Sequence, residues 1–245
     1  MSSLREWFEN LIFGTGSINS TNNVITVIGS GGKTSLIWYL AASLKNETRK
    51  ILVTPTTKMY VPDAHFYNRY YNGVPPKAEE GITLAGRFSE ANAKLESLPP
   101  ADLERIVPGY DLVLIEGDGS KGLPLKAWAE DEPVIPSLTS ITIGMLPLWP
   151  LGKPISEKII HRLPLFLELS GASEGEPVKP EHIIKLVTKC FANARGRSIL
   201  FFNQVEDDEA LRQAREFTGL FSSELRMSLD WVVAGSVKED QLEEL

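Results

Sequence analysis

One short segment has the residue types and spacing that bind phosphate. It consists of Gly29, Ser30, Gly31, Gly32, Lys33, Thr34 and Ser35. Glycines let successive backbone N–H groups converge on an anion, and the positive end of a following helix points the same way. Lys33 would reach the β- and γ-phosphates of a nucleotide, and the Thr34 hydroxyl would ligate Mg²⁺. The segment therefore predicts a site for ATP or GTP with Mg²⁺.

The spacing of these glycines differs from that of the common phosphate-binding loop. In the pattern G-x-x-x-x-G-K-[ST] the first glycine would fall at Val27. This chain instead reads G-x-x-G-K-T-S from Gly29, a shorter loop that resembles that of Mur-type ligases. The alternative is a glycine turn between a strand and a helix, with Lys33 solvated.

An acidic element, the second candidate site, follows an apolar run at residues 111–115. Glu116 and Asp118 are separated by one glycine at the expected end of a strand. Mg²⁺ on a triphosphate prefers carboxylate oxygen, directly or through water. We expect Asp118 to serve the metal and keep Glu116 as the other candidate, and both join Lys33 as predicted catalytic residues. Acids at strand ends are also ordinary loop residues.

Hydroxyl and ammonium groups follow the apolar strand at residues 51–53. Thr56, Thr57 and Lys58 would face the nucleotide, because ligands bind at the carboxyl ends of strands in open parallel sheets. They suit the γ-phosphate, its metal or a second substrate. A polar cap on a strand-to-loop junction is the alternative.

Three further cations are candidates for contacts with phosphate or substrate. Lys121 and Lys126 flank a turn after the acidic element, and Arg162 follows His161 in a segment of helical spacing. Arg162 could stabilise charge on a transferring phosphoryl group. Solvated lysines and an exposed helical arginine are the commoner cases.

The segment Asn203-Gln204-Val205-Glu206 ends an apolar strand and resembles the Asn-Lys-x-Asp element with which GTPases read guanine. Asn203 is therefore predicted to contact the nucleotide. Lys is replaced by Gln204 and Asp by Glu206, so the choice between ATP and GTP stays open. A simple turn before a helix, with acids at its N-terminus, is the alternative.

Composition limits the class of protein. A chain of 245 residues with 42% hydrophobic and 23% charged residues suits a single α/β domain over 1–245. The net charge of −7 argues against non-specific binding to nucleic acid or a membrane surface. The single Cys190 rules out an internal disulfide and fits a cytoplasmic protein. We find no signal peptide and no apolar run of about 18 residues that could span a membrane.

The spacing of apolar residues predicts the strands and helices that carry these motifs. Strands are expected at 24–28, 51–53, 82–85, 111–115, 140–145, 199–202 and 231–234. Helices are expected at 4–12, after the glycines to about 44, and at 90–98, 101–107, 155–169 (interrupted by Pro164), 180–193 and 207–217. Residues 19–23 form a polar turn, 59–80 a long surface excursion and 170–178 a possible subdomain boundary, and an acidic tail ends the chain. This order predicts an α/β, three-layer P-loop NTPase-like fold, with a mostly parallel sheet covered by helices on both faces.

Taken together, the motifs resemble those of the YqeC family. They are Ile28 to Ser35, Thr54 to Met59, Glu116 to Lys121 with Leu123 to Lys126, Glu132 to Pro136, His161-Arg162 and Asn203 to Val205. Departures from the family pattern are Gly117, Trp128 and Glu206. The resemblance implies an accessory protein of selenium-dependent molybdenum hydroxylases, acting in the synthesis or insertion of a selenium cofactor. It implies a hydroxylase or a selenium-cofactor intermediate as partner.

Three functions are consistent with these patterns. The first is a P-loop NTPase that acts as a maturation factor. The second is a small-molecule kinase or Mur-type ATP-dependent ligase, suggested by the short loop. The third is a nucleotide-binding module without catalysis.

Overall fold

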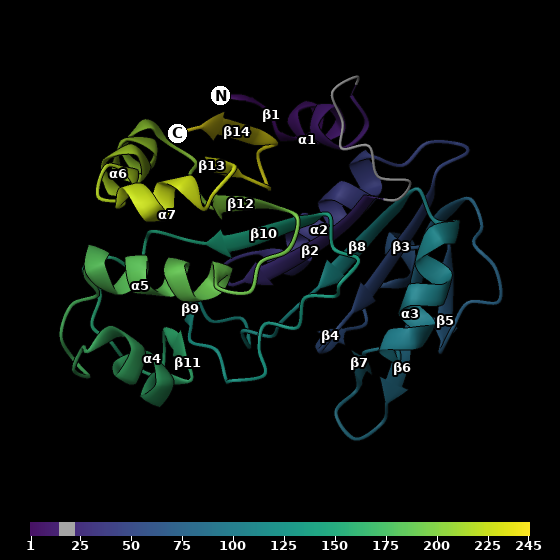
Figure 1. The fold of residues 1–245 in the computed structure, drawn as a ribbon, viewed down its shortest axis with the longest axis horizontal. Coiled ribbons are helices and arrows are strands. Elements are labelled where there is room, and N and C mark those ends of the chain that lie inside the picture. The colour runs from purple at the N-terminus through teal and green to yellow at the C-terminus, as the bar shows by residue number, and fades with distance from the viewer. Residues whose placement is uncertain (15–22) are drawn as a thin grey trace.

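A single large sheet forms the centre of the protein. The computed structural model describes residues 1–14 and 23–245. The sheet has 12 strands in the order β1-β14-β13-β12-β10-β2-β8-β3-β6-β7-β4, with β5 beside β6 (Figure 1). Its strands are β1 (Ser2–Ser3), β2 (Asn23–Gly29), β3 (Lys50–Pro55), β4 (Lys58–Tyr60), β5 (Arg69–Asn72), β6 (Gly81–Ser89), β7 (Lys94–Glu96), β8 (Leu112–Glu116), β10 (Ile141–Leu146), β12 (Arg197–Phe202), β13 (Trp231–Ser236) and β14 (Gln241–Glu244).

Parallel pairing holds the middle of this sheet together. Strands β13, β12, β10, β2, β8, β3 and β6 pair side by side in parallel. Each of β2, β8 and β10 is buried along its whole length, as expected for strands covered on both faces. Only the edges are antiparallel, where β14 joins β1 and β13, and β7 joins β4 and β6.

Helices cover both faces of the sheet. They are α1 (Leu4–Phe13), α2 (Lys33–Ser43), α3 (Pro100–Ile106), α4 (Leu163–Ser170), α5 (Pro180–Phe191), α6 (Asp208–Thr218) and α7 (Ser223–Met227). Ile25 and Val27 point to the face packed by α1 and α2. Val24 and Ile28 point to the opposite face, where α3 and α5 pack in two separate clusters. The three-layer α/β fold with a mostly parallel sheet is thus confirmed.

The helix expected at 90–98 is wrong. Residues 90–93 form a turn, and β7 returns antiparallel to β6 as a hairpin. Ala93 has a positive φ of 53°, which is incompatible with a helix. Leu95 is fully buried and lies where a side chain on Gly86 would project. Burial of Leu95 against the sheet therefore outweighs the helix propensity of this segment.

The helix expected at 155–169 is also wrong in extent. Only α4 is helical, with Pro164 in its first turn, where the missing N–H costs nothing. Before it, β11 (Ile160–His161) pairs in parallel with β9 (Leu125–Lys126) as a separate two-stranded sheet. This pairing brings two loops of the site together.

Smaller corrections concern three other segments. The acidic tail contains a strand, β14, which pairs with β1 and β13. The excursion at 59–80 contains β5, the 3₁₀ turn η1 (Ala64–Phe66) and part of β4. In the polar turn expected at 19–23, residues 19–22 lie outside the described residues, and Asn23 begins β2.

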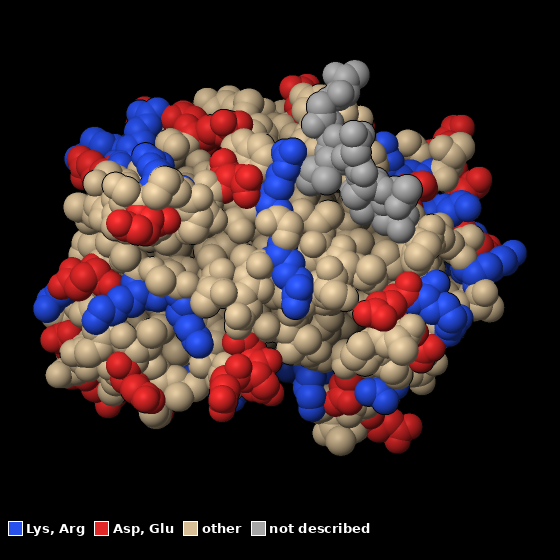
Figure 2. Space-filling view, viewed as in Figure 1, with Lys and Arg blue, Asp and Glu red and all other residues tan. Residues whose placement is uncertain are grey.

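The surface charges do not gather into one patch on the face drawn in Figure 2. Basic and acidic side chains are interspersed there. Among the described residues, no helix is both long and apolar enough to cross a membrane.

Candidate functional site

A cleft of about 780 Å³ opens at the carboxyl ends of the central strands. Its lining comes from the segments after β2, β3 and β8, from β4 and β7, and from residues 161–162. Parallel strands end at the same edge of a sheet, so segments far apart in sequence meet here.

The glycine loop, which we define as Gly29–Gly32, connects β2 to α2. Gly29 and Gly32 have φ values of 95° and 128°, which other residues rarely adopt. A Cβ on Gly29 would meet the Met145 carbonyl, and one on Gly32 would meet the Asn203 amide. Only glycine fits both positions, because the backbone conformation and the close neighbours each exclude a side chain.

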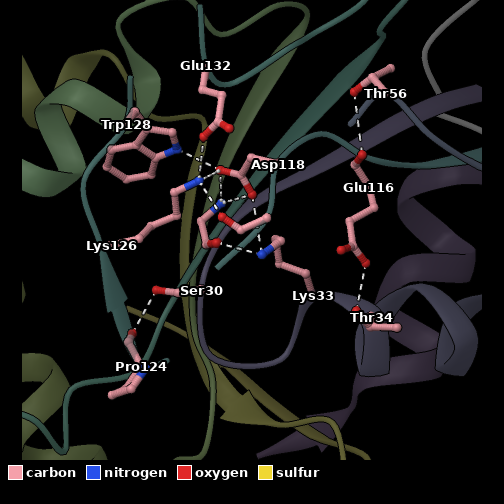
Figure 3. Close-up of polar contacts among 12 residues, drawn as sticks. Ser30, Lys33, Thr34, Thr56, Glu116, Asp118, Pro124, Lys126, Trp128 and Glu132 are labelled. Carbon is pink, nitrogen blue, oxygen red and sulfur yellow. Dashed lines mark hydrogen bonds and ion pairs between the residues drawn. The ribbon is translucent and has the colours of Figure 1, made fainter. Parts of the chain in front are cut away.

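Neighbouring strands fix the shape of this loop. The Ser30 N–H donates to the Met145 carbonyl over 2.9 Å, and the Ser30 hydroxyl donates to the Pro124 carbonyl over 2.7 Å (Figure 3). The Asn203 amide donates to the Gly31 carbonyl over 2.8 Å. The loop is therefore pre-formed by contacts to three other segments.

The N-terminus of α2 opens on the cleft without a side-chain cap. Gly32 is its N-cap and offers no side-chain acceptor, and no acid stands in the first turn. In the part of the chain that the structure describes, the N–H groups of Gly31, Gly32, Lys33 and Thr34 donate no hydrogen bond. Unpaired N–H groups at the positive end of a helix favour an anion.

Lys33 is buried beneath the loop. Its ammonium donates to the Gly29 carbonyl over 2.7 Å and lies 3.3 Å from an oxygen of Asp118 (Figure 3). An ammonium has three donors, so one remains for the cleft that Lys33 lines.

Thr34 and Glu116 form a direct pair in the cleft. The Thr34 hydroxyl donates to Glu116 Oε2 over 2.6 Å. Burial raises the pKa of Glu116, and Lys33 together with the Thr34 hydrogen bond partly offsets that rise. A hydroxyl and a carboxylate side by side are hard oxygen donors of the kind that Mg²⁺ prefers.

Asp118, in contrast, is turned away from the cleft. Its fully buried carboxylate accepts from the Gly29 N–H at 3.0 and 3.1 Å and from the Trp128 indole N–H at 2.6 Å. It also lies between the ammonium groups of Lys33 and Lys126, at 3.3 and 3.1 Å. These partners occupy both carboxylate oxygens.

A chain of ion pairs continues from Asp118 to the far wall of the cleft. Lys126, whose side chain is fully buried, lies 3.0 Å from Glu132, and Arg162 donates to both oxygens of Glu132 at 2.6 and 2.7 Å. We call Lys33, Asp118, Lys126, Glu132 and Arg162 the ion-pair chain. Both of its ends line the cleft.

Sequence reasoning missed Glu132 and Trp128 as parts of this site and gave Lys126 only an anion-binding role. All three lie in or near the motifs that carry the family resemblance. Buried charges must be paired. Lys126 among apolar residues, followed by Glu132, was therefore the sequence signal that could have indicated a buried ion pair.

The segment after β3 reaches the same cleft. The Thr56 hydroxyl donates to the Val134 carbonyl over 2.7 Å, which ties this segment to the loop after β8. The Thr57 hydroxyl oxygen is buried and has no hydrogen-bond partner among the described residues. The Lys58 ammonium lies 3.0 Å from a carboxylate oxygen of Glu96. All three predicted residues line the cleft.

Lys121 and His161 also line the cleft. Lys121 is exposed and has a positive φ of 53°. Burial, helped by the charges of Arg162, Lys126 and Lys121, lowers the pKa of His161 from 6.5 to about 4. The imidazole is therefore neutral near pH 7.

Asn203 lies behind the glycine loop. Besides its bond to Gly31, it accepts from the Val237 N–H over 3.1 Å, so its side chain braces the loop. Gln204 lines the cleft and accepts from the Trp149 indole, and Glu206 accepts from the Ser236 hydroxyl. The structure brings this element to the loop, and its contact with a base stays a prediction.

The fold and the cleft define a class of protein. It is a three-layer α/β protein with a glycine loop, a lysine and a hydroxyl–carboxylate pair at the carboxyl edge of its sheet. The family described as YqeC protein matches residues 25–164, and the chain belongs to this family. It is similar to the protein of Escherichia coli (strain K12) named "Uncharacterized protein YqeC", with 33% identity over 171 residues and 67% of each chain covered. The match to the family contains the glycine loop and the whole ion-pair chain.

Proposed function

We propose that the cleft binds a nucleoside triphosphate with Mg²⁺ and hydrolyses it. One observation carries this proposal: the uncapped N-terminus of α2, Lys33 and the Thr34–Glu116 pair all face one cleft. An anion-binding backbone, a cation and a metal-type oxygen pair are the parts that phosphoryl transfer requires.

Each group has a distinct role in this proposal. The N–H groups from Gly31 to Thr34 would hold the β- and γ-phosphates, and Lys33 would neutralise their charge. Thr34 and Glu116 would hold Mg²⁺, with phosphate oxygens and water completing its shell. The bound metal would neutralise charge that develops between the β- and γ-phosphates.

Glu116 is the better metal candidate of the two acids. It lines the cleft beside Thr34, whereas both oxygens of Asp118 are engaged by the loop, Trp128 and two lysines. Asp118 would instead position Lys33 and the Gly29 N–H. This division of labour leaves open ATP or GTP as the nucleotide.

The biological role that we propose follows from the family. An accessory protein of selenium-dependent molybdenum hydroxylases would use hydrolysis to drive a conformational change during synthesis or insertion of the selenium cofactor. Its partner would be the hydroxylase or an intermediate of the cofactor.

Calorimetry with variants tests the nucleotide site. We expect Lys33→Ala and Thr34→Val to lower the affinity for Mg·ATP or Mg·GTP by at least about tenfold, because each removes a contact to a charged group. Glu116→Gln should abolish the Mg²⁺ dependence of binding and of phosphate release. Lys153→Ala, at an exposed lysine outside the cleft, is the matched control. Wild-type affinity in Lys33→Ala would refute the site.

A kinase or ligase is the second candidate, and the extent of the cleft favours it. The cleft continues from the glycine loop to Lys58, Lys121 and Arg162, which leaves room for an acceptor. A kinase or ligase would release product only when an acceptor is present, whereas a switch NTPase would show basal hydrolysis. Binding without turnover under every condition would indicate a non-catalytic module.

A further inference from the structure

The cleft carries more cationic groups than the proposed nucleotide site uses. Its lining holds five lysine or arginine side chains and three carboxylates, whereas the whole chain has a net charge of −7. A positive cleft in an acidic protein concentrates anions at that one place. Beyond Lys33, the lining cations lie on β4, on β7, in the loop after β8 and next to β11.

Lys121 is an exposed member of this set. Among the described residues it forms no ion pair and no side-chain hydrogen bond, in contrast to Lys58, which pairs with Glu96. It adopts a positive φ of 53°, a conformation that costs free energy for a residue with a side chain. Such strain is typical of functional positions, and here it accompanies an unpaired ammonium at the cleft.

Arg162 and His161 lie on the strand-and-turn segment that β9 pairs with. Arg162 binds Glu132 through both terminal nitrogens, and Glu132 is shared with Lys126. One carboxylate therefore serves two cations at this wall. The guanidinium keeps further N–H donors for a ligand.

The electrostatic potential around His161 is positive. Burial is the main reason that its pKa falls to about 4, but three cations contribute, and Lys121 is among them. The single opposing carboxylate, Glu132, does not cancel them. A neutral imidazole beside uncompensated positive charge can donate a hydrogen bond to an oxyanion without adding a buried charge.

We propose that Lys121, His161 and Arg162 form a seat for the carboxylate or phosphate group of a second substrate. This inference rests on the proposed function, because it assigns the acceptor's anion to the same cleft. Arginine and lysine together suit a compact oxyanion, since the guanidinium fixes its orientation and the ammonium adds charge.

The triphosphate itself does not require this seat. The glycine loop, the α2 N-terminus and Lys33 already supply donors for the β- and γ-phosphates. The unpartnered, buried Thr57 hydroxyl lines the cleft as well, and a second ligand would give it a partner. The seat would therefore orient an acceptor toward the γ-phosphate rather than hold the nucleotide.

Anion titration into the nucleotide-loaded protein tests the proposal. The protein is saturated with Mg²⁺ and the non-hydrolysable imido analogue of ATP or GTP, whichever binds more tightly, so that the γ-phosphate position is filled. Sodium phosphate and sodium acetate are then titrated at constant ionic strength, and binding is measured by calorimetry. We expect one of them to bind wild-type protein and to bind Lys121→Ala about tenfold more weakly. Lys121→Arg should restore binding, and Lys153→Ala should behave as wild type.

Two results would overturn the seat. One is binding of the analogue with no binding of either anion. The other is a loss of about tenfold in analogue affinity in Lys121→Ala with ADP affinity unchanged, which would assign Lys121 to the γ-phosphate. If no nucleotide binds, the proposed function fails separately. The same anions are then titrated into the protein without nucleotide, into Lys121→Ala and into Lys33→Ala. Anion binding that depends on Lys121 and not on Lys33 supports the seat, and any other result rejects it.

Discussion

The carboxylate of Asp118 lies between two buried ammonium groups. It has Lys33 on one side and Lys126 on the other, and it also accepts from the Gly29 N–H and the Trp128 indole. A buried lysine is stable in its charged form only when a carboxylate pairs with it. At the scale of single residues, Asp118 thus links the glycine loop to the opposite wall of the cleft.

Replacement of Asp118 by asparagine should destabilise the fold. Asp118→Asn leaves two buried lysines with one carboxylate fewer, and we expect a loss of about 3 kcal/mol in the free energy of unfolding. Urea denaturation measures it, with Asp131→Asn at an exposed aspartate as the matched control. An unchanged stability with weakened Mg·nucleotide binding would instead make Asp118 a metal ligand.

His161 should make the stability of the protein depend on pH. Its pKa is lowered from 6.5 to about 4, mainly by burial. Between these values the unfolded chain binds a proton that the folded protein does not, so stability falls as the pH drops from 6.5 to about 4. We expect the melting temperature of His161→Gln to fall less than that of wild type over this interval. Parallel curves for the two proteins would contradict the shift, and His65→Gln, at an exposed histidine, controls for the loss of a histidine.

At the scale of elements, the two ends of the chain complete one edge of the sheet. β14 pairs antiparallel with β13 and with β1, and Leu242 on β14 is fully buried against the α1 and α2 side of the core. The sequence by itself predicted only an acidic tail at these residues. Leu242, Glu243 and Glu244 instead lie on a strand that pairs with β13, and the Leu242 side chain faces the core.

Shortening Leu242 tests the contribution of this edge. Leu242→Ala should lower the free energy of unfolding by about 3 kcal/mol, because it removes buried methyl groups and leaves a cavity. Leu220→Ala is the matched control, since Leu220 is 55% exposed. Equal effects of the two substitutions in urea denaturation would show that β14 does not contribute to the core.

The hairpin of β6 and β7 illustrates why one element could not be predicted. Glutamate, alanine, lysine and leucine favour a helix locally, and the sequence of 90–98 contains all four. The close packing of Leu95 over Gly86 decides otherwise, and it joins residues that share no local pattern. The same hairpin carries Lys94 and Glu96 to the wall of the cleft.

At the scale of the whole molecule, the cleft is made by the order of the strands. β8 lies between β2 and β3 in the sheet although it is distant from both in sequence, so the glycine loop, Glu116 and Thr56 meet at one edge. The net-positive lining of the cleft is likewise a property of the fold, because its five cations come from separate segments of a chain whose net charge is −7.

The sequence alone predicted most helices, the glycine loop, the family resemblance and seven strands, namely β2, β3, β6, β8, β10, β12 and β13, since each depends on neighbouring residues. The periodicity of apolar residues and the spacing of glycines are local signals, and they can be recognised without a structure. Only the tertiary structure decided that Glu116 faces the cleft beside Thr34 while Asp118 is buried between Lys33 and Lys126. The two acids are separated by one residue, and their different roles depend on partners from distant segments, because burial and pairing of charge are set by packing.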